Sequence, residues 1–186
     1  MTPPTLSVIL FTVLILATGG ERIHELVVST RNARWAFAQG GVESGRGHLP
    51  AMIALHTGML VGALAEVWLL GRAFVPLLGW PMLVIALLCQ VGRVWIIRSL
   101  GHQWNTRVIV VPGLALQRRG PYRWARLPHP NYLLVAVEGI ALPLVHTAWI
   151  TALAFTVLNA ILLIGFRIPT EDRALKAAAT VPKVAA

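Results

Sequence analysis

Charged residues and cysteine are scarce in this 186-residue chain, and each shortage excludes a class of protein. Only 12% of the residues are charged and 56% are hydrophobic, whereas soluble domains carry about 25% charged residues. This composition excludes an ordinary soluble domain and is typical of an integral membrane protein. The single cysteine, Cys89, lies in an apolar run, which excludes a disulfide framework and a cluster of thiolate metal ligands.

Acidic residues are also few, with 7 against 16 Lys and Arg, so the formal net charge is +9. The basic residues flank apolar segments, as the topology of a membrane protein requires, and we therefore expect no nucleic-acid partner. His, Asp and Glu are not grouped with the spacing of metal ligands, so we also expect no bound metal.

Five apolar segments approach the roughly 20 residues that cross the hydrocarbon core of a bilayer. The first lacks the basic residues that precede a signal-peptide core, and we expect a retained helix that can continue into ERIHELVV. The fourth and fifth, separated only by HTAW, predict a tight helical hairpin. The fold class is therefore an all-α integral membrane protein with five transmembrane helices. The expected spans are residues 5–20, 51–71, 74–98, 132–147 and 149–166.

The distribution of Lys and Arg predicts the orientation of these spans. Segments 21–50, 98–131 and 167–186 hold 4, 6 and 4 of them, whereas the opposite ends of the spans hold 0, 1 and 0. By the positive-inside rule, the large basic segments and the C-terminus face the cytoplasm and the N-terminus lies outside.

Polar residues inside apolar spans are costly and often functional. Glu66, Arg72 and Arg93 lie near the ends of spans, where we expect solvated or snorkelling side chains. Glu138 lies about two turns into the fourth span, where a carboxylate needs a cationic partner. Two roles stay open for it: structural pairing with an arginine, or a place in the wall of an active site.

Two cytoplasmic motifs carry most of the polar chemistry. RRGPYRWARLPHPNY, residues 118–132, combines arginines and aromatic rings with prolines that impose extended or turn conformations. Such a loop can bind an anion, stack on a planar ring or contact lipid headgroups. RIPTEDRAL, residues 167–175, places Arg167 and Glu171 on one face if a helix continues past Pro169. Upstream, VIVV at 108–111 has the composition of a strand.

These motifs, in order around a hairpin, resemble the isoprenylcysteine carboxyl methyltransferase family, membrane enzymes that use S-adenosylmethionine. The family pattern G-x-Y-R-x-x-R-H-P-x-Y, followed by R-I-x-x-E-[ED], is similar to GPYRWARLPHPNY and RIPTED. The resemblance covers about residues 100–175. Five spans resemble the short prokaryotic branch, and WNTRVIVVPG and EGIALPLVHTAW resemble a bacterial subgroup that methylates alkylpyrone and alkylresorcinol lipids. The Arg-His-Pro of the pattern is two residues longer here, running from Arg126 through Leu127 and Pro128 to His129 and Pro130.

The resemblance implies a cytoplasmic pocket for S-adenosylmethionine in a protein of the bacterial inner membrane. We divide the single membrane domain into a three-helix part (1–98), a catalytic part (99–175) and a frayed tail (176–186). Arg167 would face the methyl-accepting group, and Glu171 and Glu138 complete the expected catalytic set. The residues expected to bind the cofactor are Arg107, Leu116, Gln117, Tyr122, His129, Pro130, Asn131, Tyr132 and Glu171.

The expected activity is methyl transfer to an oxygen of a lipophilic substrate, such as a prenylated or polyketide lipid, within membrane lipids. A carboxylate acceptor needs no base at neutral pH, whereas a phenol with a pKa of about 10 needs one, for which His129 and Glu138 are candidates. Two alternatives stay open. One is methylation of a phospholipid amine, and the other is a non-enzymatic membrane protein whose basic loop binds lipid.

Overall fold

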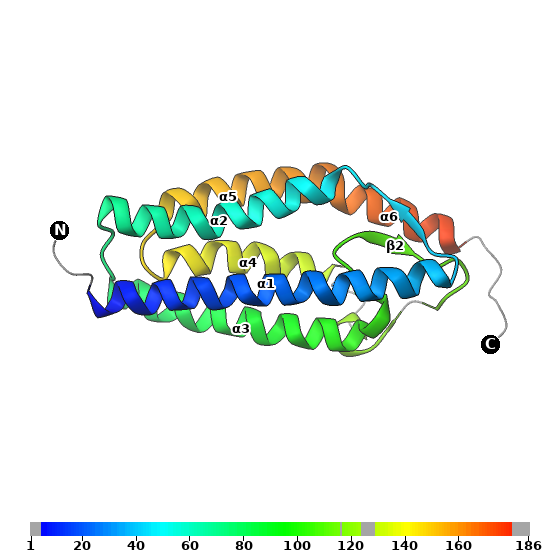
Figure 1. Ribbon diagram of the computed structural model, residues 1–186, viewed down its shortest axis with the longest axis horizontal. Coiled ribbons are helices and arrows are strands. Elements are labelled where there is room, and N and C mark those ends of the chain that lie inside the picture. Colours follow the sequence, from blue (N-terminus) through cyan, green and yellow to red (C-terminus); the bar gives the residue numbers. More distant parts are fainter. Residues whose placement is uncertain (1–4, 116, 124–128, 180–186) are drawn as a thin grey trace.

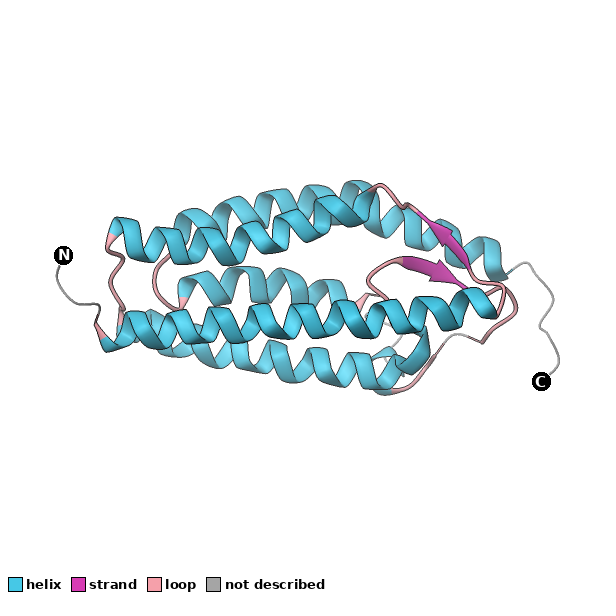
Figure 2. Ribbon diagram, viewed as in Figure 1, coloured by secondary structure: helices cyan, strands magenta, loops and turns pink. Residues whose placement is uncertain are grey.

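The structure is a computed structural model that describes residues 5–115, 117–123 and 129–179. Helices form an elongated bundle, and a small two-stranded sheet lies at the end that holds α6 (Figures 1 and 2). The expectation of an all-α membrane protein is confirmed. In chain order the elements are α1 (Leu6–Ala38), β1 (Val42–Ser44), α2 (His48–Leu70), α3 (Pro76–Leu100), η1 (Gly101–Gln103), β2 (Val108–Val110), η2 (Gly120–Arg123), α4 (Pro130–Leu144), α5 (Trp149–Leu162), the π-helical η3 (Leu163–Arg167) and α6 (Ile168–Ala179).

Helical stretches long and apolar enough to cross a membrane occur four times in the described part of the chain. The fourth expected span is α4, an apolar helix of 15 residues. At 1.5 Å per residue it is about 22 Å long, which is shorter than the roughly 30 Å hydrocarbon core. The four long stretches are Leu6–Ala38, His48–Leu70, Pro76–Gln103 and Trp149–Ala178.

The first helix is much longer than the first expected span. Its 33 residues make α1 about 50 Å long. The helix continues through ERIHELVV, as the sequence allows, and then extends to Ala38, so Arg31 and Arg34 also belong to it. The last helix is longer too, because α5 continues through η3 into α6 and ends at Ala179. Helix α6 therefore covers the first residues of the expected frayed tail, and 180–186 lie outside the described residues.

The apolar core lies in the half of the bundle away from the sheet. Helix α4 packs between α3 and α5, and α2 packs along α5 (Figure 1). Phe11 and Ile15 of α1 meet Leu142 of α4 in this core. A Cβ atom on Gly139 would collide with the ring of Phe155, so glycine is what allows α4 and α5 to approach this closely.

A buried charge cluster joins α1, α3 and α4, and consists of Arg22, Glu25, Gln90, Arg93 and Glu138. Arg93 Nη2 donates to Glu138 Oε2 at 2.7 Å, and Arg22 also donates to this carboxylate. Gln90 Nε2 adds a bond of 2.9 Å to Glu138, and Arg22 Nη1 donates to Glu25 at 2.8 Å. With two arginines and two carboxylates, the cluster is formally neutral.

This cluster favours structural pairing, one of the two roles left open for Glu138. The residue is 3% exposed, and its two oxygens accept from three side chains of the neighbouring helices. The expectation that Arg93 snorkels to the membrane surface is wrong, because Arg93 is 5% exposed. The buried carboxylate of Glu138 holds the Arg93 guanidinium inside the bundle. The position of Arg93 within its apolar span does not reveal this contact.

Glu66 also differs from its expected solvated state, since it is 6% exposed. Its carboxylate accepts from the backbone N–H groups of Ile150 and Thr151 at 3.2 and 2.8 Å, and from Arg72 Nε at 3.0 Å. The first N–H groups of a helix have no partner within that helix and carry partial positive charge. Glu66 of α2 therefore caps α5, and this contact fixes the hairpin at the end opposite the sheet.

The VIVV run forms β2, as expected, and its partner strand is β1. The pairing is antiparallel, with Val42 opposite Val110 and Ser44 opposite Val108. Strand β1 lies in a Gly-rich connection and has only three residues, so it carries too little periodicity to be predicted. Helix α6 packs on the sheet, which ties the α1–α2 connection to the C-terminal motif.

Candidate functional site

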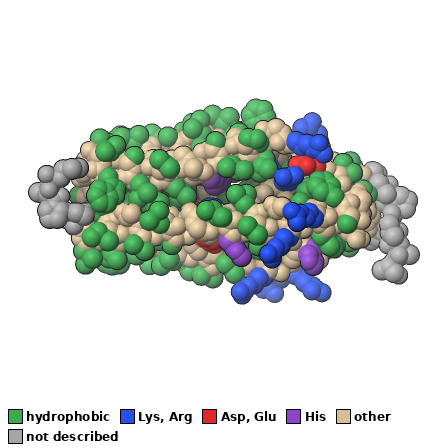
Figure 3. All heavy atoms as spheres, in the orientation of Figure 1, with side chains coloured by type: hydrophobic (Ala, Val, Ile, Leu, Met, Phe, Trp, Pro, Cys, Tyr) green, Lys and Arg blue, Asp and Glu red, His purple; other side chains and the backbone are tan. Residues whose placement is uncertain are grey.

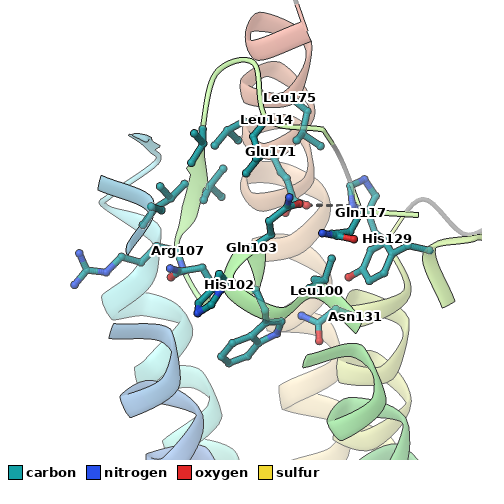
Figure 4. A pocket seen from close by; sticks show the side chains of 18 of the residues that line it. Leu100, His102, Gln103, Arg107, Leu114, Gln117, His129, Asn131, Glu171 and Leu175 are labelled. Carbon is teal, nitrogen blue, oxygen red and sulfur yellow. Dashed lines mark hydrogen bonds and ion pairs between the residues drawn. The ribbon is translucent and has the colours of Figure 1, made fainter. Parts of the chain in front are cut away.

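A cavity of about 480 Å³ lies at the end of the molecule that holds the sheet and α6 (Figure 4). This volume is within the range of small-molecule sites, about 300–1,000 Å³. The end of α1, the segment 100–111, η2, the start of α4, η3 and α6 form its wall. The expected site residues that line it are Arg107, Gln117, Tyr122, His129, Asn131, Tyr132, Arg167 and Glu171.

Two further expected residues, Pro130 and Glu138, lie elsewhere. Pro130 is buried as the first residue of α4, where proline suits the helix start, and it is not among the described residues that line the cavity. Glu138 belongs to the buried charge cluster rather than to the cavity wall. Leu116 lies outside the described residues. So does the 124–128 segment, which holds Arg126 and the two residues by which the motif is longer than the family pattern.

A chain of hydrogen bonds joins the two motifs across the cavity. Arg167 Nε donates to the Tyr132 oxygen at 3.0 Å, and the Tyr132 hydroxyl donates to Glu171. Arg167 Nη2 donates to the carbonyl oxygen of Thr106 at 2.6 Å. Arg167 and Glu171 therefore line one cavity, as their spacing predicts, and Tyr132 of α4 connects them.

The π-helical turn η3 ends at Arg167, which is 7% exposed. A π-turn holds one more residue than an α-turn, so it rotates the side chains that follow it relative to a regular helix. Such turns occur often at functional sites. The sequence carries no signal for this turn, and helical spacing alone predicts neither the burial of Arg167 nor its contact with Tyr132.

His129 lies between two carboxylates of α6. Its Nε2 is 3.2 Å from Asp172 Oδ1, its Nδ1 is 3.7 Å from Glu171 Oε1, and its ring stacks on Tyr132 with centroids 5.2 Å apart. Figure 4 shows the interaction of His129 with Glu171 as a dashed line across the cavity. The Glu171 carboxylate raises the pKa of His129 most, Asp172 adds to this effect, and burial opposes it.

The raised pKa of His129 gives a pH-dependent stability. The imidazolium contact stabilises the fold fully below the ordinary His pKa of about 6.5, and this contribution is lost as the pH rises through the higher folded-state pKa. We expect the melting temperature to fall over that window in the natural protein and not in His129→Gln. Thermal unfolding in detergent from pH 5 to 9 measures this, and identical pH profiles for the two proteins would contradict the raised pKa.

Two buried polar atoms of the cavity wall have no hydrogen-bond partner within the described residues: Asn131 Oδ1 and Trp104 Nε1. An unpaired acceptor and an unpaired donor are costly when buried, so they favour a polar ligand in this cavity. Burial raises the pKa of Tyr122, which therefore stays a neutral phenol able to donate a hydrogen bond. The cavity thus combines aromatic surfaces with hydrogen-bond donors and hydrogen-bond acceptors.

Arg107 contributes to the wall, but its guanidinium points away from the cavity in Figure 4. It lies 3.7 Å from the carboxylate of Glu43 in β1. The aromatic residues Trp35, His102 and Trp104 also line the cavity. Of these three, only Trp104 lies in a segment that carries the resemblance, WNTRVIVVPG. Trp35 stacks on His102 with centroids 5.2 Å apart, a contact between α1 and η1 for which the sequence has no signal.

Exposed basic side chains gather at the same end of the molecule as the cavity, whereas hydrophobic side chains cover the rest of the face in Figure 3. This is the distribution that a membrane protein with one polar end requires. Within the described residues, no group of three or more His, Cys, Asp or Glu is placed to hold a metal ion. Among the described residues, the exposed basic ones are Arg31, Arg34, Arg46, Arg98, Arg118, Arg119, Arg123, Arg173 and Lys176.

Comparisons with known proteins agree with the resemblance in the motifs. The sequence model of the isoprenylcysteine carboxyl methyltransferase (ICMT) family matches residues 82–177. The uncharacterized protein YpbQ of Bacillus subtilis (strain 168) is 36% identical over 168 residues, which cover 90% of this chain and 97% of that protein. No solved structure matches the chain significantly.

Proposed function

The chain belongs to the isoprenylcysteine carboxyl methyltransferase family, and from this membership we propose that it transfers a methyl group from S-adenosylmethionine to an oxygen of a lipophilic substrate. The observation that carries the proposal is the cavity in which Arg167 and Glu171 meet through Tyr132. A cation and a carboxylate, held a short distance apart, suit an anionic acceptor beside a cationic cofactor.

The residues of the cavity fit S-adenosylmethionine. The aromatic rings of Tyr122, Tyr132 and Trp104 offer surfaces for a planar adenine and for a cation. Asn131 Oδ1 and Trp104 Nε1 supply an unpaired acceptor and an unpaired donor, and Glu171 supplies negative charge. When bound, S-adenosylmethionine would supply a sulfonium-activated methyl group, whose transfer is an in-line displacement.

The main tasks of the residues of this chain would be to align the cofactor with the acceptor and to exclude water from both. Glu171, held by Tyr132 and flanked by His129, would attract the positive charge of the cofactor. Arg167 would orient the accepting oxygen, because bonds to Tyr132 and Thr106 use only two of the five N–H donors of a guanidinium. The buried apolar side chain of Val108 helps to keep water from the reacting atoms.

The acceptor is proposed to be an oxygen rather than an amine. Arg167 is buried in the cavity wall, and a buried cation repels an ammonium group while it orients a carboxylate or a phenolate. The exposed apolar surface around the helices favours an acceptor that reaches the site from the bilayer, such as a prenylated or polyketide lipid. A carboxylate is the simplest acceptor, because it needs no base.

The proposed orientation places the cavity and the C-terminus in the cytoplasm and the start of α1 outside, with α4 as a fifth, short span in the inner membrane of a bacterium. The gathering of exposed arginines at the cavity end supports this orientation. The polar cofactor would then enter from the cytoplasm and the lipid from the membrane.

The identity of the methylated product tests the proposal. Purified protein is incubated with methyl-labelled S-adenosylmethionine and a bacterial lipid extract, and labelled lipids are identified by mass spectrometry. We expect the label in an ester or an aryl or enol ether. Label in a phospholipid amine would replace the oxygen acceptor by nitrogen, and the absence of any labelled lipid would contradict the proposal.

A further inference from the structure

The buried positions of α1 form one stripe, which includes more polar residues in the second half of the helix than in the first. Phe11 and Ile15 in the first half are apolar, whereas Glu25, Ser29 and Asn32 in the second half are polar. All five are at most 7% exposed, and their spacing of three, four and seven residues keeps the last three on one face. The stripe lies outside the matched family region 82–177, so its function must be inferred from its contacts.

Ser29 is bonded to Asn105, which lines the cavity, and to the next residue, Thr106. Its hydroxyl donates to Asn105 Oδ1 at 2.8 Å and accepts from the backbone N–H of Thr106 at 3.0 Å. It also lies 2.7 Å from the Thr106 hydroxyl, and its backbone carbonyl accepts from Asn105 Nδ2 at 3.2 Å. Asn105 Oδ1 accepts in turn from the backbone N–H of Arg107. Through its hydroxyl and its backbone carbonyl, Ser29 thus fixes Asn105 and Thr106, and Asn105 in turn holds Arg107.

Asn32 holds the preceding part of the same segment. Its Nδ2 donates to the carbonyl oxygens of Gly101 and Trp104, at 3.1 and 2.7 Å. Gly101 directly follows α3 and has a φ of 54°, a conformation that favours glycine, so the chain turns sharply here. Asn32 binds both ends of η1 and sets how this turn lies against α1.

The Ser29 contacts lead to Arg167 through Thr106, and Asn32 holds the residues that precede Thr106. The N–H of Thr106 is bound by Ser29, and its carbonyl oxygen accepts from Arg167 Nη2 at 2.6 Å. We propose that Ser29 and Asn32 are positioning residues that hold segment 101–107 so that Thr106 aims the Arg167 guanidinium into the cavity. This inference rests on the proposed function, and it adds α1 to the elements on which methyl transfer depends.

Replacing Ser29 with alanine tests the inference in turnover. Alanine keeps helix propensity, so α1 is expected to form normally. Because small misplacements at a reacting centre cost up to about 100-fold, we expect Ser29→Ala to lower kcat/KM for the acceptor by about 10- to 100-fold. Thr30→Ala is the matched control. It removes a hydroxyl from the adjacent, exposed position, where Thr30 bonds only back to Leu26 of its own helix among the described contacts, and should retain the natural turnover.

A double substitution separates positioning from a general loss of stability. If Ser29 acts through Arg167, then adding Ser29→Ala to Arg167→Lys should lower kcat/KM by less than about 3-fold, because coupled sites are not additive. If Ser29→Ala lowers kcat/KM by the same factor in the Arg167→Lys protein as in the natural protein, the inference is overturned, while the proposed methyl transfer stays in place. No turnover of the natural protein with any lipid fraction would instead overturn both.

Hydrogen exchange gives a readout that does not depend on activity. The Thr106 amide, bound by Ser29 in the natural protein, should exchange faster in Ser29→Ala and at an unchanged rate in Thr30→Ala. Peptides that cover 104–110, followed by mass spectrometry, report this rate. Equal protection in Ser29→Ala and the natural protein would show that Ser29 does not hold the segment, and would overturn the inference even with turnover intact.

Discussion

Replacing Arg167 with lysine is expected to lower kcat/KM for methyl transfer by about 100- to 1,000-fold, a loss typical of removing one donor aimed at a reacting oxygen. Arg167 bonds Tyr132 and the Thr106 carbonyl from two different nitrogens, and this leaves further N–H groups for a ligand. Lysine keeps the positive charge but not the planar fork, so it cannot hold both partners and orient an acceptor at once. Initial rates with labelled cofactor and a fixed acceptor measure the effect.

Arg173→Lys is the matched control for this substitution. Arg173 lies six residues further on in α6, is exposed, and bonds the backbone of Pro169 on its own helix. It should retain turnover within about 2-fold, as is usual for exposed sites away from a reaction centre. Because Arg167 is proposed to act on the acceptor, its lysine variant should bind S-adenosylmethionine nearly as well as the natural protein. A loss of cofactor affinity as large as the loss of turnover would contradict that role.

Replacing Glu138 with leucine is expected to destabilise the protein by about 3–5 kcal/mol, the usual cost of leaving a buried charge without its partner. Arg93 donates to Glu138 at 2.7 Å and is 5% exposed, so water cannot replace the carboxylate. Arg22 would keep its bond to Glu25, but the cluster would carry one uncompensated positive charge. Thermal unfolding in detergent, followed by size-exclusion chromatography, measures the loss.

A second substitution distinguishes charge imbalance from lost packing. Glu138→Leu combined with Arg93→Leu leaves Arg22 and Glu25 as one balanced pair, and apolar replacements of buried ion pairs are often neutral. We expect the double variant to recover most of the stability that the single variant loses. If it unfolds as early as Glu138→Leu alone, then the cluster stabilises the bundle through its shape rather than through paired charge.

The positions of most helices along the chain, and several residues that share the cavity, could be predicted from local sequence signals. Apolar runs marked α2, α3 and α5, and the VIVV composition marked β2. The two family motifs predicted that His129, Tyr132, Arg167 and Glu171 line one cavity. These features depend on residue type and spacing within a short stretch, which is the information that a single sequence carries.

The remaining features depend on contacts between distant segments. Arg93 lies near the end of an apolar run and is expected to snorkel, but Glu138, 45 residues away, holds it inside. Glu66 is retained in the bundle by N–H groups of a helix that begins more than 80 residues later. The role of the polar face of α1 can be inferred only from the contact between Ser29 and Thr106, which are far apart in the sequence. None of these pairings leaves a pattern in the local sequence. The sequence alone therefore predicts, for each of these residues, the environment that is commonest for its residue type at such a position.

Binding of S-adenosylmethionine to the purified protein, measured by isothermal titration calorimetry in detergent or nanodiscs, tests the central claim most directly. The natural protein should bind one equivalent per chain. Glu171→Gln should lose at least about 10-fold in affinity, because a charge-assisted contact contributes about 1.5–3 kcal/mol. Glu21→Gln, a half-buried acid in the middle of α1, should bind normally. No binding by the natural protein, or equal binding by Glu171→Gln, would contradict the account.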